Sequence, residues 1–464
     1  MFTNKYRFLS LLLAAGLMPQ PQFGLAGEQA VKQLEGMAGQ TAVAVPAAVP
    51  VQESASASKA VPIDRVYSGR VRKTISKNIP ASVMIQGFDW SSHRVKPWWN
   101  VMSGKAGEIA SAGFDIIWFP PSGQAASDEG YIPVQLYNQN SQYGTVQQLQ
   151  SAINTFHARN MLVLADVVIN HRVGSTDWGD FTNPQWGPDS VCSDDEWGGA
   201  RGHRDTGWGF QAARDIDHTQ PYVQESVKDW LRWLKNDIGY DGWRYDYGKG
   251  YSPSYIELYN GASSPVFSVG EIWDNLDINN PNPHRQSLCN WIDGLHGKAT
   301  AFDFTTKGML QHAVGAHEYW RLRDGAGKPV GLIGWWPEQA VTFLDNHDTG
   351  PSTGGGQSHW PFPSDRVMQG YAYILTHPGI PCVYWPHFFD WGQDMKSRIT
   401  ALVKFRKAKG ITSKATVNIL VADSSRYAAQ INNNVVMKIG PGDYNPGAGW
   451  TLALSGKDYA VWSR

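Results

Sequence analysis

Four short segments of this chain share one layout, an apolar and β-prone run that ends on acidic, histidine or asparagine side chains. They span residues 162–171, 242–246, 268–271 and 340–348. Strands that are buried on both faces of a parallel sheet read as continuous apolar runs, and polar residues at their carboxyl ends lie along one rim. This layout therefore predicts a parallel sheet with a carboxylate-rich site at one edge.

From residue 81 onward, strand patterns alternate with helical ones. Residues 222–236, for example, carry apolar side chains at helical spacing. Eight strands are expected, at 83–90, 115–120, 161–168, 241–246, 266–273, 300–304, 340–348 and 381–385. Eight strands separated by helices predict a (β/α)8 TIM barrel rather than an open sheet.

The spacing of these strands predicts how the chain divides into domains. We expect the barrel over 79–172 and 219–411, because the third and fourth strands are much further apart than the roughly 30 residues of one βα unit. The Gly-, Asp- and Trp-rich stretch 173–218 between them suits a small irregular inserted domain. Short alternating runs at 417–421, 427–431, 435–439 and 459–462 predict a C-terminal antiparallel β-sheet domain over 412–464.

The N-terminus has the layout of a targeting segment. Lys5 and Arg7 precede an apolar stretch at 8–18 and a small-residue site near 24–26, which predicts a signal peptide over 1–26. Residues 27–78 are rich in Ala, Val, Ser, Gln and Pro and are expected to be a linker or disordered. Secretion to the extracellular space or periplasm is the prediction, and a plastid transit peptide is the alternative.

Charge and composition narrow the partners. Lys plus Arg total 40 against 41 Asp plus Glu, for a net charge of -1, which gives no support for nucleic acid or an anionic membrane. Most of the 21 Trp are expected to pack in the core. Four of them, Trp178, Trp186, Trp197 and Trp208, lie beside Gly, Pro or acidic residues, where a loop is expected. Exposed aromatic rings in loops are suited to stacking against the apolar faces of sugars.

Three cysteines, Cys192, Cys289 and Cys382, permit at most one intramolecular disulfide. They lack the spacing of a zinc site, and a structural role is expected for them.

The carboxylates at the strand ends match the requirements of glycoside hydrolysis, which uses one carboxylate at the anomeric carbon and one carboxylic acid at the leaving oxygen. Asp246 and Glu271 end the fourth and fifth strands, so they are expected to be neighbours. Arg244 points to the same face as Asp246 and is expected to hold it ionised. Apolar neighbours are expected to raise the pKa of Glu271 and keep it protonated.

Asp348 and its neighbour His347 are expected to contact sugar hydroxyls, and His171 and Tyr131 to line the same pocket. Each of these residues also has an ordinary interpretation, because an Asp at a strand end is commonly a turn former or a helix cap. Only their joint occurrence at the ends of separate strands favours a glycosidase. From the residues alone, a metal-dependent barrel hydrolase remains a close alternative.

Several segments resemble one known family. The segments 166–171, 242–246, 270–273 and 343–348 resemble the four signature regions of the α-amylase family, glycoside hydrolase family 13. Further segments resemble its plant-type subgroup, at 215–218, 249–252, 334–337, 360–365, 369–382 and 458–462. The resemblance covers roughly residues 80–464 and implies an α-amylase with a retaining mechanism.

The resemblance also implies individual roles in catalysis. Asp246 matches the catalytic nucleophile, Glu271 the general acid/base and Asp348 the transition-state stabiliser. Retention implies that the two working carboxyl groups lie about 5 Å apart. Four residues match those that line the subsite where the sugar is distorted: Tyr131, His171, Arg244 and His347. Lys249 and Trp273 match contacts to glucose units beyond the bond, whereas Asp166 is assigned a structural role.

A structural Ca²⁺ between barrel and inserted domain is also implied. Its expected ligands are the side chains of Asn170, Asp205 and Asp215 and the backbone carbonyls of Trp208 and Gly250. These are the hard oxygen donors that calcium prefers.

The same resemblance matches Trp335 and Trp336 to a surface pair that docks on starch granules. The resulting prediction is a secreted, calcium-binding, endo-acting α-amylase that hydrolyses internal α-1,4-glucosidic bonds of starch, glycogen or maltooligosaccharides. A monomer without nucleic-acid or membrane partners is expected. The alternatives are an exo-acting maltooligosaccharide-forming amylase, a transglycosylase on the same scaffold, and a starch-binding pseudoenzyme.

Overall fold

The computed structural model describes residue 75 and residues 77–174 and 178–464. The expected signal peptide lies outside the described residues, as does most of the expected linker. Among the described residues, no helix has both the length and the apolar character needed to cross a bilayer.

Eight parallel strands close into a barrel in the order β1-β12-β11-β10-β9-β8-β5-β2. They are β1 (Met84–Gln86), β2 (Ile116–Trp118), β5 (Leu162–Val167), β8 (Gly242–Tyr245), β9 (Phe267–Gly270), β10 (Thr300–Phe302), β11 (Ala340–Phe343) and β12 (Ile380–Val383). The predicted TIM barrel is confirmed, with one strand in each expected segment. Each strand is shorter than its apolar run, because the polar ends of the runs leave the ladder and form the rim.

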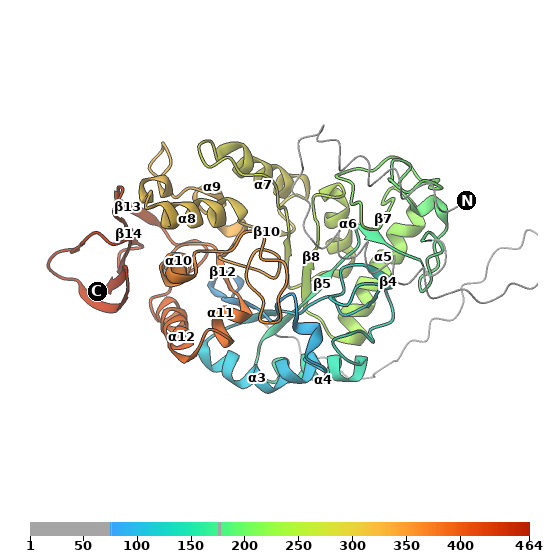
Figure 1. Cartoon of the computed structure of the whole chain (residues 1–464), viewed down its shortest axis with the longest axis horizontal. Coiled ribbons are helices and arrows are strands. Elements are labelled where there is room, and N and C mark those ends of the chain that lie inside the picture. Colours follow the sequence, from blue (N-terminus) through green and yellow to red (C-terminus); the bar gives the residue numbers. More distant parts are fainter. Residues whose placement is uncertain (1–74, 76, 175–177) are drawn as a thin grey trace, which may run out of the picture.

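Helices surround the barrel (Figure 1). The longer ones are α3 (Trp98–Ala112), α4 (Val146–His157), α5 (Pro221–Trp233), α6 (Pro253–Ser263), α7 (Asn282–Gly294), α8 (Phe304–Ala316), α10 (Val367–Thr376) and α12 (Gln393–Ala408). Local sequence explains their starts: Thr145 and Gln148 form a capping box on α4, and the Asp303 carboxylate accepts from Thr306 N on α8. Two short helices, α9 (Leu332–Trp335) and α11 (Trp385–Phe389), lie between barrel elements.

Between β5 and β8 the chain leaves the barrel and forms an irregular segment that includes β7 (Arg214–Asp215). It lies at one end of the long axis of the molecule (Figure 1). β7 pairs antiparallel with β6 (His171–Arg172), with His171 opposite Asp215. A second short pair, β3 (Gln124–Ala125) and β4 (Pro133–Gln135), lies in the loop after β2. These pairings bring the start and end of the irregular segment together at the rim.

The C-terminal residues form a five-stranded antiparallel sheet at the opposite end (Figure 1). Its strands are β13 (Val417–Ala422), β14 (Tyr427–Ile431), β15 (Val435–Ile439), β16 (Thr451–Gly456) and β17 (Tyr459–Ser463). Four of them match the alternating runs in the sequence. β16 was not predicted, because it carries only two leucines at strand spacing, Leu452 and Leu454, and its side chains are mostly exposed.

The buried apolar side chains of barrel, helices and C-terminal sheet form one continuous core cluster. Cys192, Cys289 and Cys382 are all buried and free, so they form no disulfide with one another.

Candidate active site

Strand register places the first two carboxylates side by side. Tyr245 of β8 pairs with Gly270 of β9, so the next residues, Asp246 and Glu271, leave adjacent strands at the same level. Glu271 N donates to Tyr245 O over 3.0 Å, and Asp246 N donates to Val167 O over 3.0 Å. The backbone therefore holds both residues at the carboxyl-terminal rim of the barrel.

Arg244 joins three carboxylates from beneath. Its Nη1 donates to Asp246 Oδ1 over 2.7 Å and to Asp166 Oδ1 over 2.8 Å. Its Nη2 lies 2.9 Å from Glu271 Oε2, close enough for an ion pair but outside the alignment of a hydrogen bond. The guanidinium is fully buried and lies 4.8 Å from the Trp118 ring centroid. One buried cation thus determines the spacing of the carboxylates.

Asp166 belongs to this network as well as to the fold. Besides the bond from Arg244, its Oδ2 accepts from Tyr131 Oη over 2.8 Å and from Trp118 Nε1 over 3.0 Å. Burial raises the pKa of Asp166 to about 7, and the Arg244 guanidinium opposes that rise. Asp166 therefore supports both Arg244 and Tyr131 from below the rim.

Burial raises the pKa of Glu271, and neighbouring Asp246 raises it further, while Arg244 acts in the opposite direction. This is the direction that its apolar neighbours in the sequence predict. Glu271 Oε2 accepts from Tyr247 N over 3.2 Å, whereas Oε1 is buried without a hydrogen-bond partner among the described residues. A protonated carboxyl with one free oxygen can donate to a ligand.

Two opposing effects act on the pKa of Asp246. Burial raises the pKa of Asp246 and outweighs the lowering by Arg244. Asp246 nevertheless has an aligned, short hydrogen bond from Arg244, which Glu271 lacks. Since hydrogen bonds to the charged form favour ionisation, geometry favours the anion on Asp246 and the proton on Glu271.

Asp348 reaches the site from the loop that follows β11. Burial raises its pKa well above the ordinary value, and Glu271 adds to the shift. His347 Nε2 lies 3.2 Å from Asp348 Oδ2, and Gln86 Nε2 lies 3.0 Å from His347 Nδ1. Because burial lowers the pKa of His347, the ring is neutral, and an amide donor at Nδ1 leaves the proton on Nε2 facing Asp348.

Aromatic rings form one wall. The Tyr131 ring stacks on the His347 ring with centroids 4.9 Å apart, and the Trp90 ring lies parallel to both at 6.0 and 6.1 Å. His171 Nε2 donates to Tyr131 O over 2.8 Å, and burial lowers the pKa of His171 to about 4, so it is a neutral hydrogen-bonding group. This wall combines flat apolar faces with neutral polar edges.

On the other side of Glu271 lie the remaining predicted contacts. Lys249 Nζ is 5.6 Å from the Tyr247 ring centroid and 5.1 Å from that of Trp208, and burial lowers its pKa. Trp273 is half-buried and stacks on Phe304 with centroids 5.6 Å apart. Both side chains follow strands that carry the carboxylates.

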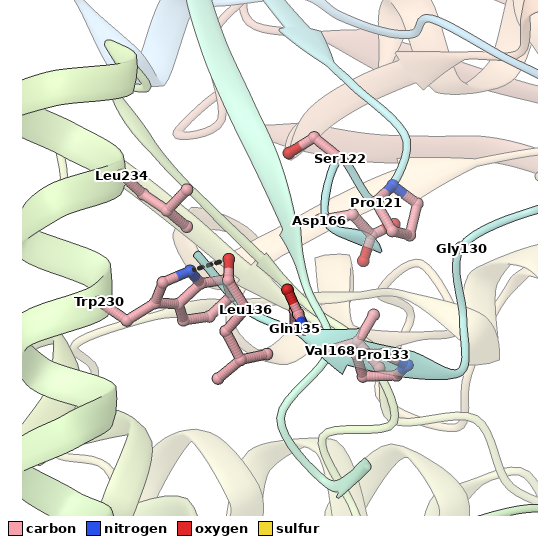
Figure 2. Close-up of a pocket in the computed structure, with 11 residues that line it drawn as sticks. Pro121, Ser122, Gly130, Pro133, Gln135, Leu136, Asp166, Val168, Trp230 and Leu234 are labelled. Carbon is pink, nitrogen blue, oxygen red and sulfur yellow. Dashed lines mark hydrogen bonds between the residues drawn. The ribbon is translucent and has the colours of Figure 1, made fainter. Parts of the chain in front are cut away.

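A small cavity of about 20 Å³ lies behind Asp166. Trp230 and Leu234 line it from the helical side, and Pro121, Ser122 and Asp166 line it from the barrel side (Figure 2). Trp230 Nε1 donates to Leu136 O over 2.8 Å at its edge. Its volume is that of about one water molecule, so it is distinct from any site for a sugar.

The predicted calcium ligands converge where the irregular segment meets the barrel. Asn170 Nδ2 donates to Asp215 Oδ1 over 3.3 Å, which turns the Asn170 amide oxygen away from that carboxylate. A Cβ at Gly250 would lie 1.9 Å from Asn170 Oδ1, so this oxygen faces the Gly250 backbone. Asp205 Oδ2 is buried without a hydrogen-bond partner among the described residues. Burial raises the pKa of Asp215 to about 8. Side-chain oxygens therefore gather here, and burial disfavours the ionised form of Asp215.

A neighbouring group of three carboxylates adds to this negative charge. Asp195, Glu196 and Asp215 each place an oxygen within 4.8 Å of the others. Asp195 accepts from Arg214 Nε over 3.0 Å, and Asp194 accepts from Asp205 N over 2.8 Å. Asp194 therefore orients the loop that carries Asp205.

Trp335 and Trp336 lie at the end of the short helix α9. Trp335 is 40% exposed and lies over the Arg285 guanidinium at 3.9 Å, whereas Trp336 is half-buried and packs against the core. Only one ring of the pair is thus broadly accessible.

Sequence reasoning missed several residues that shape this site. Trp90, Trp118 and Gln86 come from barrel segments outside the four signature regions, so no pattern marked them. The Phe210 ring, which stacks on His171 with centroids 3.8 Å apart, comes from the irregular segment. Asp166 carried a signal, as the first residue of a recognisable signature segment, but its ion pair with Arg244 depends on the β5 to β8 register.

Comparisons with known proteins agree with this architecture. Two family models match, the alpha amylase catalytic domain over residues 104–185 and the alpha-amylase C-terminal beta-sheet domain over residues 408–463. The chain is 45% identical over 396 residues to probable alpha-amylase 2 of Arabidopsis thaliana, which covers 82% of this chain and 94% of that protein.

The chain is also 43% identical over 395 residues to the chloroplastic alpha-amylase 3 of Arabidopsis thaliana, which covers 82% of this chain and 44% of that longer protein. A solved structure of an Anoxybacillus alpha-amylase matches with a TM-score of 0.64 at 17% identity, covering 84% of this chain and 98% of that one. At that identity, the solved structure supports the fold alone.

Proposed function

This chain belongs to the α-amylase family of glycoside hydrolases, in its plant-type subgroup, and we propose that it is an endo-acting α-amylase. Its substrates are the internal α-1,4-glucosidic bonds of starch, glycogen and related maltooligosaccharides. One observation carries the proposal: a single buried guanidinium, that of Arg244, contacts the carboxylates of Asp246 and Glu271 at the ends of adjacent strands.

In the proposed mechanism, Asp246 attacks the anomeric carbon while Glu271 transfers its proton to the leaving glycosidic oxygen. A covalent glycosyl ester on Asp246 forms, and the shortened glucan leaves. Glu271, now ionised, removes a proton from water, which hydrolyses the ester and retains the configuration. The free Oε1 of Glu271 and its raised pKa support the acid role, and the aligned bond from Arg244 supports the anion on Asp246.

Asp348, with the Nε2 proton of His347 beside it, is proposed to bind sugar hydroxyls in the subsite where the ring distorts. His171 and Tyr131 complete that subsite. The parallel rings of Tyr131 and Trp90 are suited to the apolar face of the distorted glucose. Hydrogen bonds that become stronger as the sugar ring flattens stabilise the transition state more than the bound substrate. They therefore raise kcat and do not merely lower KM.

The test is the activity of two conservative variants on soluble starch. Asp246→Asn and Glu271→Gln keep the shape of each side chain but remove the nucleophile and the acid. We expect each to lower kcat by at least about 10²-fold, since acid catalysis alone contributes about 10²–10⁴-fold.

Asp229→Asn is the matched control, because Asp229 is an exposed carboxylate on α5. Starch hydrolysis that survives Asp246→Asn or Glu271→Gln unchanged contradicts the mechanism. Product sizes from amylose over time separate endo from exo action, since release of one oligosaccharide length from the first minutes contradicts the endo assignment.

A structural Ca²⁺ is proposed where the irregular segment joins the barrel. Asn170, Asp205 and Asp215 would supply side-chain oxygens, and Trp208 and Gly250 backbone carbonyls. The residues fit such an ion, because Asp205 Oδ2 has no hydrogen-bond partner among the described residues and the Asn170 oxygen points at the Gly250 backbone. When bound, the ion would neutralise carboxylates whose burial is otherwise unfavourable.

Further proposals concern the whole protein. The barrel is assigned to 79–172 and 219–411, the calcium-binding insertion to 173–218 and the sheet domain to 412–464. Trp335, next to the half-buried Trp336, is proposed to contact starch granules. The test compares how much of the Trp335→Ala variant and of the unsubstituted protein adsorbs to granular starch. Secretion after cleavage near Gly27 is proposed over plastid import, although one relative is chloroplastic. Sequencing the mature N-terminus tests this, and light scattering tests the proposed monomer.

A further inference from the structure

Trp208 has the most exposed of the large apolar side chains among the described residues, with 59% of its surface exposed. An indole in water forgoes the stabilisation that burial of its surface would provide. One exposed aromatic residue is not unusual by itself. The contacts around Trp208 therefore have to show whether its exposed ring is placed to bind a ligand.

The backbone beneath Trp208 is tightly held. Trp208 N donates to Lys249 O over 3.1 Å. A Cβ at the preceding Gly207 would lie 2.4 Å from the Gly250 carbonyl carbon, so the loop rests on the chain segment after β8 at a distance that only glycine permits. The indole is thus presented from an anchored position, which reduces the entropy lost when a ligand binds.

A series of contacts connects Trp208 with the proposed acid, through the backbone and ring of Tyr247 and the side chain of Lys249. Tyr247 N donates to Glu271 Oε2 over 3.2 Å. Lys249 Nζ lies 5.6 Å from the Tyr247 ring centroid and 5.1 Å from the Trp208 ring centroid. Trp208 is the outermost member of this series. Glu271 is the proposed acid at the leaving oxygen, and this series starts beside it.

We propose that the Trp208 indole is a stacking platform for a glucose unit in the leaving part of the α-glucan, further from the cleaved bond than Tyr247. The inference rests on the proposed function and adds a binding subsite to it. A glucose ring has an apolar face of C–H groups and an edge of hydroxyls. The indole covers the face, and the adjacent Lys249 ammonium donates to the hydroxyls.

The platform makes binding depend on the length of the leaving part. Substrates with several glucose units beyond the bond reach Trp208, whereas a substrate whose leaving group is a single small ring does not. Maltoheptaose and 2-chloro-4-nitrophenyl α-maltotrioside differ in this respect. Both are attacked by the same proposed nucleophile, Asp246, so a loss confined to maltoheptaose points to its longer leaving part.

The experiment measures KM and kcat of Trp208→Ala and Trp208→Phe on both substrates. We expect Trp208→Ala to raise KM for maltoheptaose about three- to tenfold, the range expected from the 0.5–1.5 kcal/mol of an aromatic stacking contact. Its kcat on maltoheptaose and its kcat/KM on the chloronitrophenyl substrate should stay within about twofold of the starting protein. Trp208→Phe keeps a flat aromatic ring, so its KM for maltoheptaose should be close to that of the unsubstituted protein.

Trp320→Ala is the matched control, because Trp320 is also widely exposed, at 48%, beside an arginine, but lies away from the rim. Equal losses of Trp208→Ala on both substrates, a melting temperature whose response to chelator changes, or no effect on either substrate would each overturn the platform. Absence of activity in the unsubstituted protein on both substrates would instead contradict the proposed function itself.

Discussion

At the scale of residues, the distribution of protons in the site follows from Arg244. Its one positive charge contacts Asp166, Asp246 and Glu271, and Asp348 lies in the same field. Four buried carboxyl groups cannot all ionise around one cation, since burial and mutual repulsion raise their pKa values. Hydrogen-bond alignment then assigns the proton to Glu271 rather than to Asp246.

Lys249 provides a test of this proton assignment. Its charge lowers the pKa of Glu271. An acid catalyst works only while protonated, so activity falls as the pH rises through that pKa. Removal of the positive charge in Lys249→Met raises the pKa of Glu271. We therefore expect the basic limb of the pH profile of kcat/KM to move to higher pH, measured on maltoheptaose, whose sugar leaving group needs the proton of Glu271.

The control for this experiment is Lys414→Met, which removes an exposed lysine that pairs with Glu338. It should leave the profile unchanged. A basic limb that moves to lower pH in Lys249→Met, or stays in place, would show that Glu271 does not set it.

At the scale of elements, the junction between the irregular segment and the barrel depends on close backbone approach. Loop residues before β7 rest on the turn after β8 where glycines leave room, and Asn170 after β5 enters the same space. Polar side-chain oxygens are thereby brought close to the backbone after β8, and one of them, Asp205 Oδ2, has no hydrogen-bond donor among the described residues.

Gly250→Ala tests that junction. The added Cβ would lie 1.9 Å from Asn170 Oδ1, so we expect a loss of about 1–3 kcal/mol in unfolding free energy from overpacking. At a free calcium concentration of about 100 times the Kd, calcium binding stabilises the folded state by about 2.7 kcal/mol. Chelator should therefore lower the melting temperature of the unsubstituted protein clearly, but that of Gly250→Ala little, measured by calorimetry.

Gly261→Ala is the matched control, because Gly261 lies within α6 and a Cβ there meets no atom within 4 Å. It should be neutral or stabilise by up to about 1 kcal/mol. A melting temperature of the unsubstituted protein that ignores chelator would count against the proposed ion.

At the scale of the whole molecule, the C-terminal sheet and the barrel share one hydrophobic core. Tyr427 of β14 is fully buried, and its hydroxyl donates to His377 Nε2, after α10, over 2.9 Å. The His377 ring stacks on Tyr373 of α10 with centroids 3.8 Å apart. Arg406 of α12 donates to the carbonyls of His377 and Gly379, so it connects α12 to the chain segment after α10.

This shared core predicts that barrel and sheet unfold together. We expect one calorimetric transition in the presence of calcium, and Tyr427→Ala should lower its temperature through a loss of about 3–5 kcal/mol. Leu420→Ala is the control in the same sheet, because Leu420 is 42% exposed and should cost less than about 0.5 kcal/mol. Two separate transitions, with Tyr427→Ala affecting only one, would contradict a single cooperative core.

Much of the fold was predictable because local pattern and global fold agree. Seven of the eight barrel strands lie within their expected segments, and β12 begins one residue earlier, at Ile380. The apolar side chains of α5 recur at the helical spacing seen in the sequence, although the helix continues through a π-helical turn at Leu234–Ile238. β16 was not predictable, since an exposed edge strand needs no apolar side chains. The residues that support the carboxylates were not predictable either, because Trp118, Trp90 and Gln86 come from strands whose ends carry no signature.

The sequence by itself determined which side chains stand at the strand ends, because apolar runs specify buried strands and polar residues must leave them at the rim. It thereby identified Asp246, Glu271 and Asp348 as candidates. Only the tertiary structure decided how they share charge. Strand register brings Arg244 opposite Asp166 and sets Asp246 beside Glu271, and burial of this group shifts every pKa within it. Such energies depend on distances between residues far apart in the chain, which no local pattern encodes.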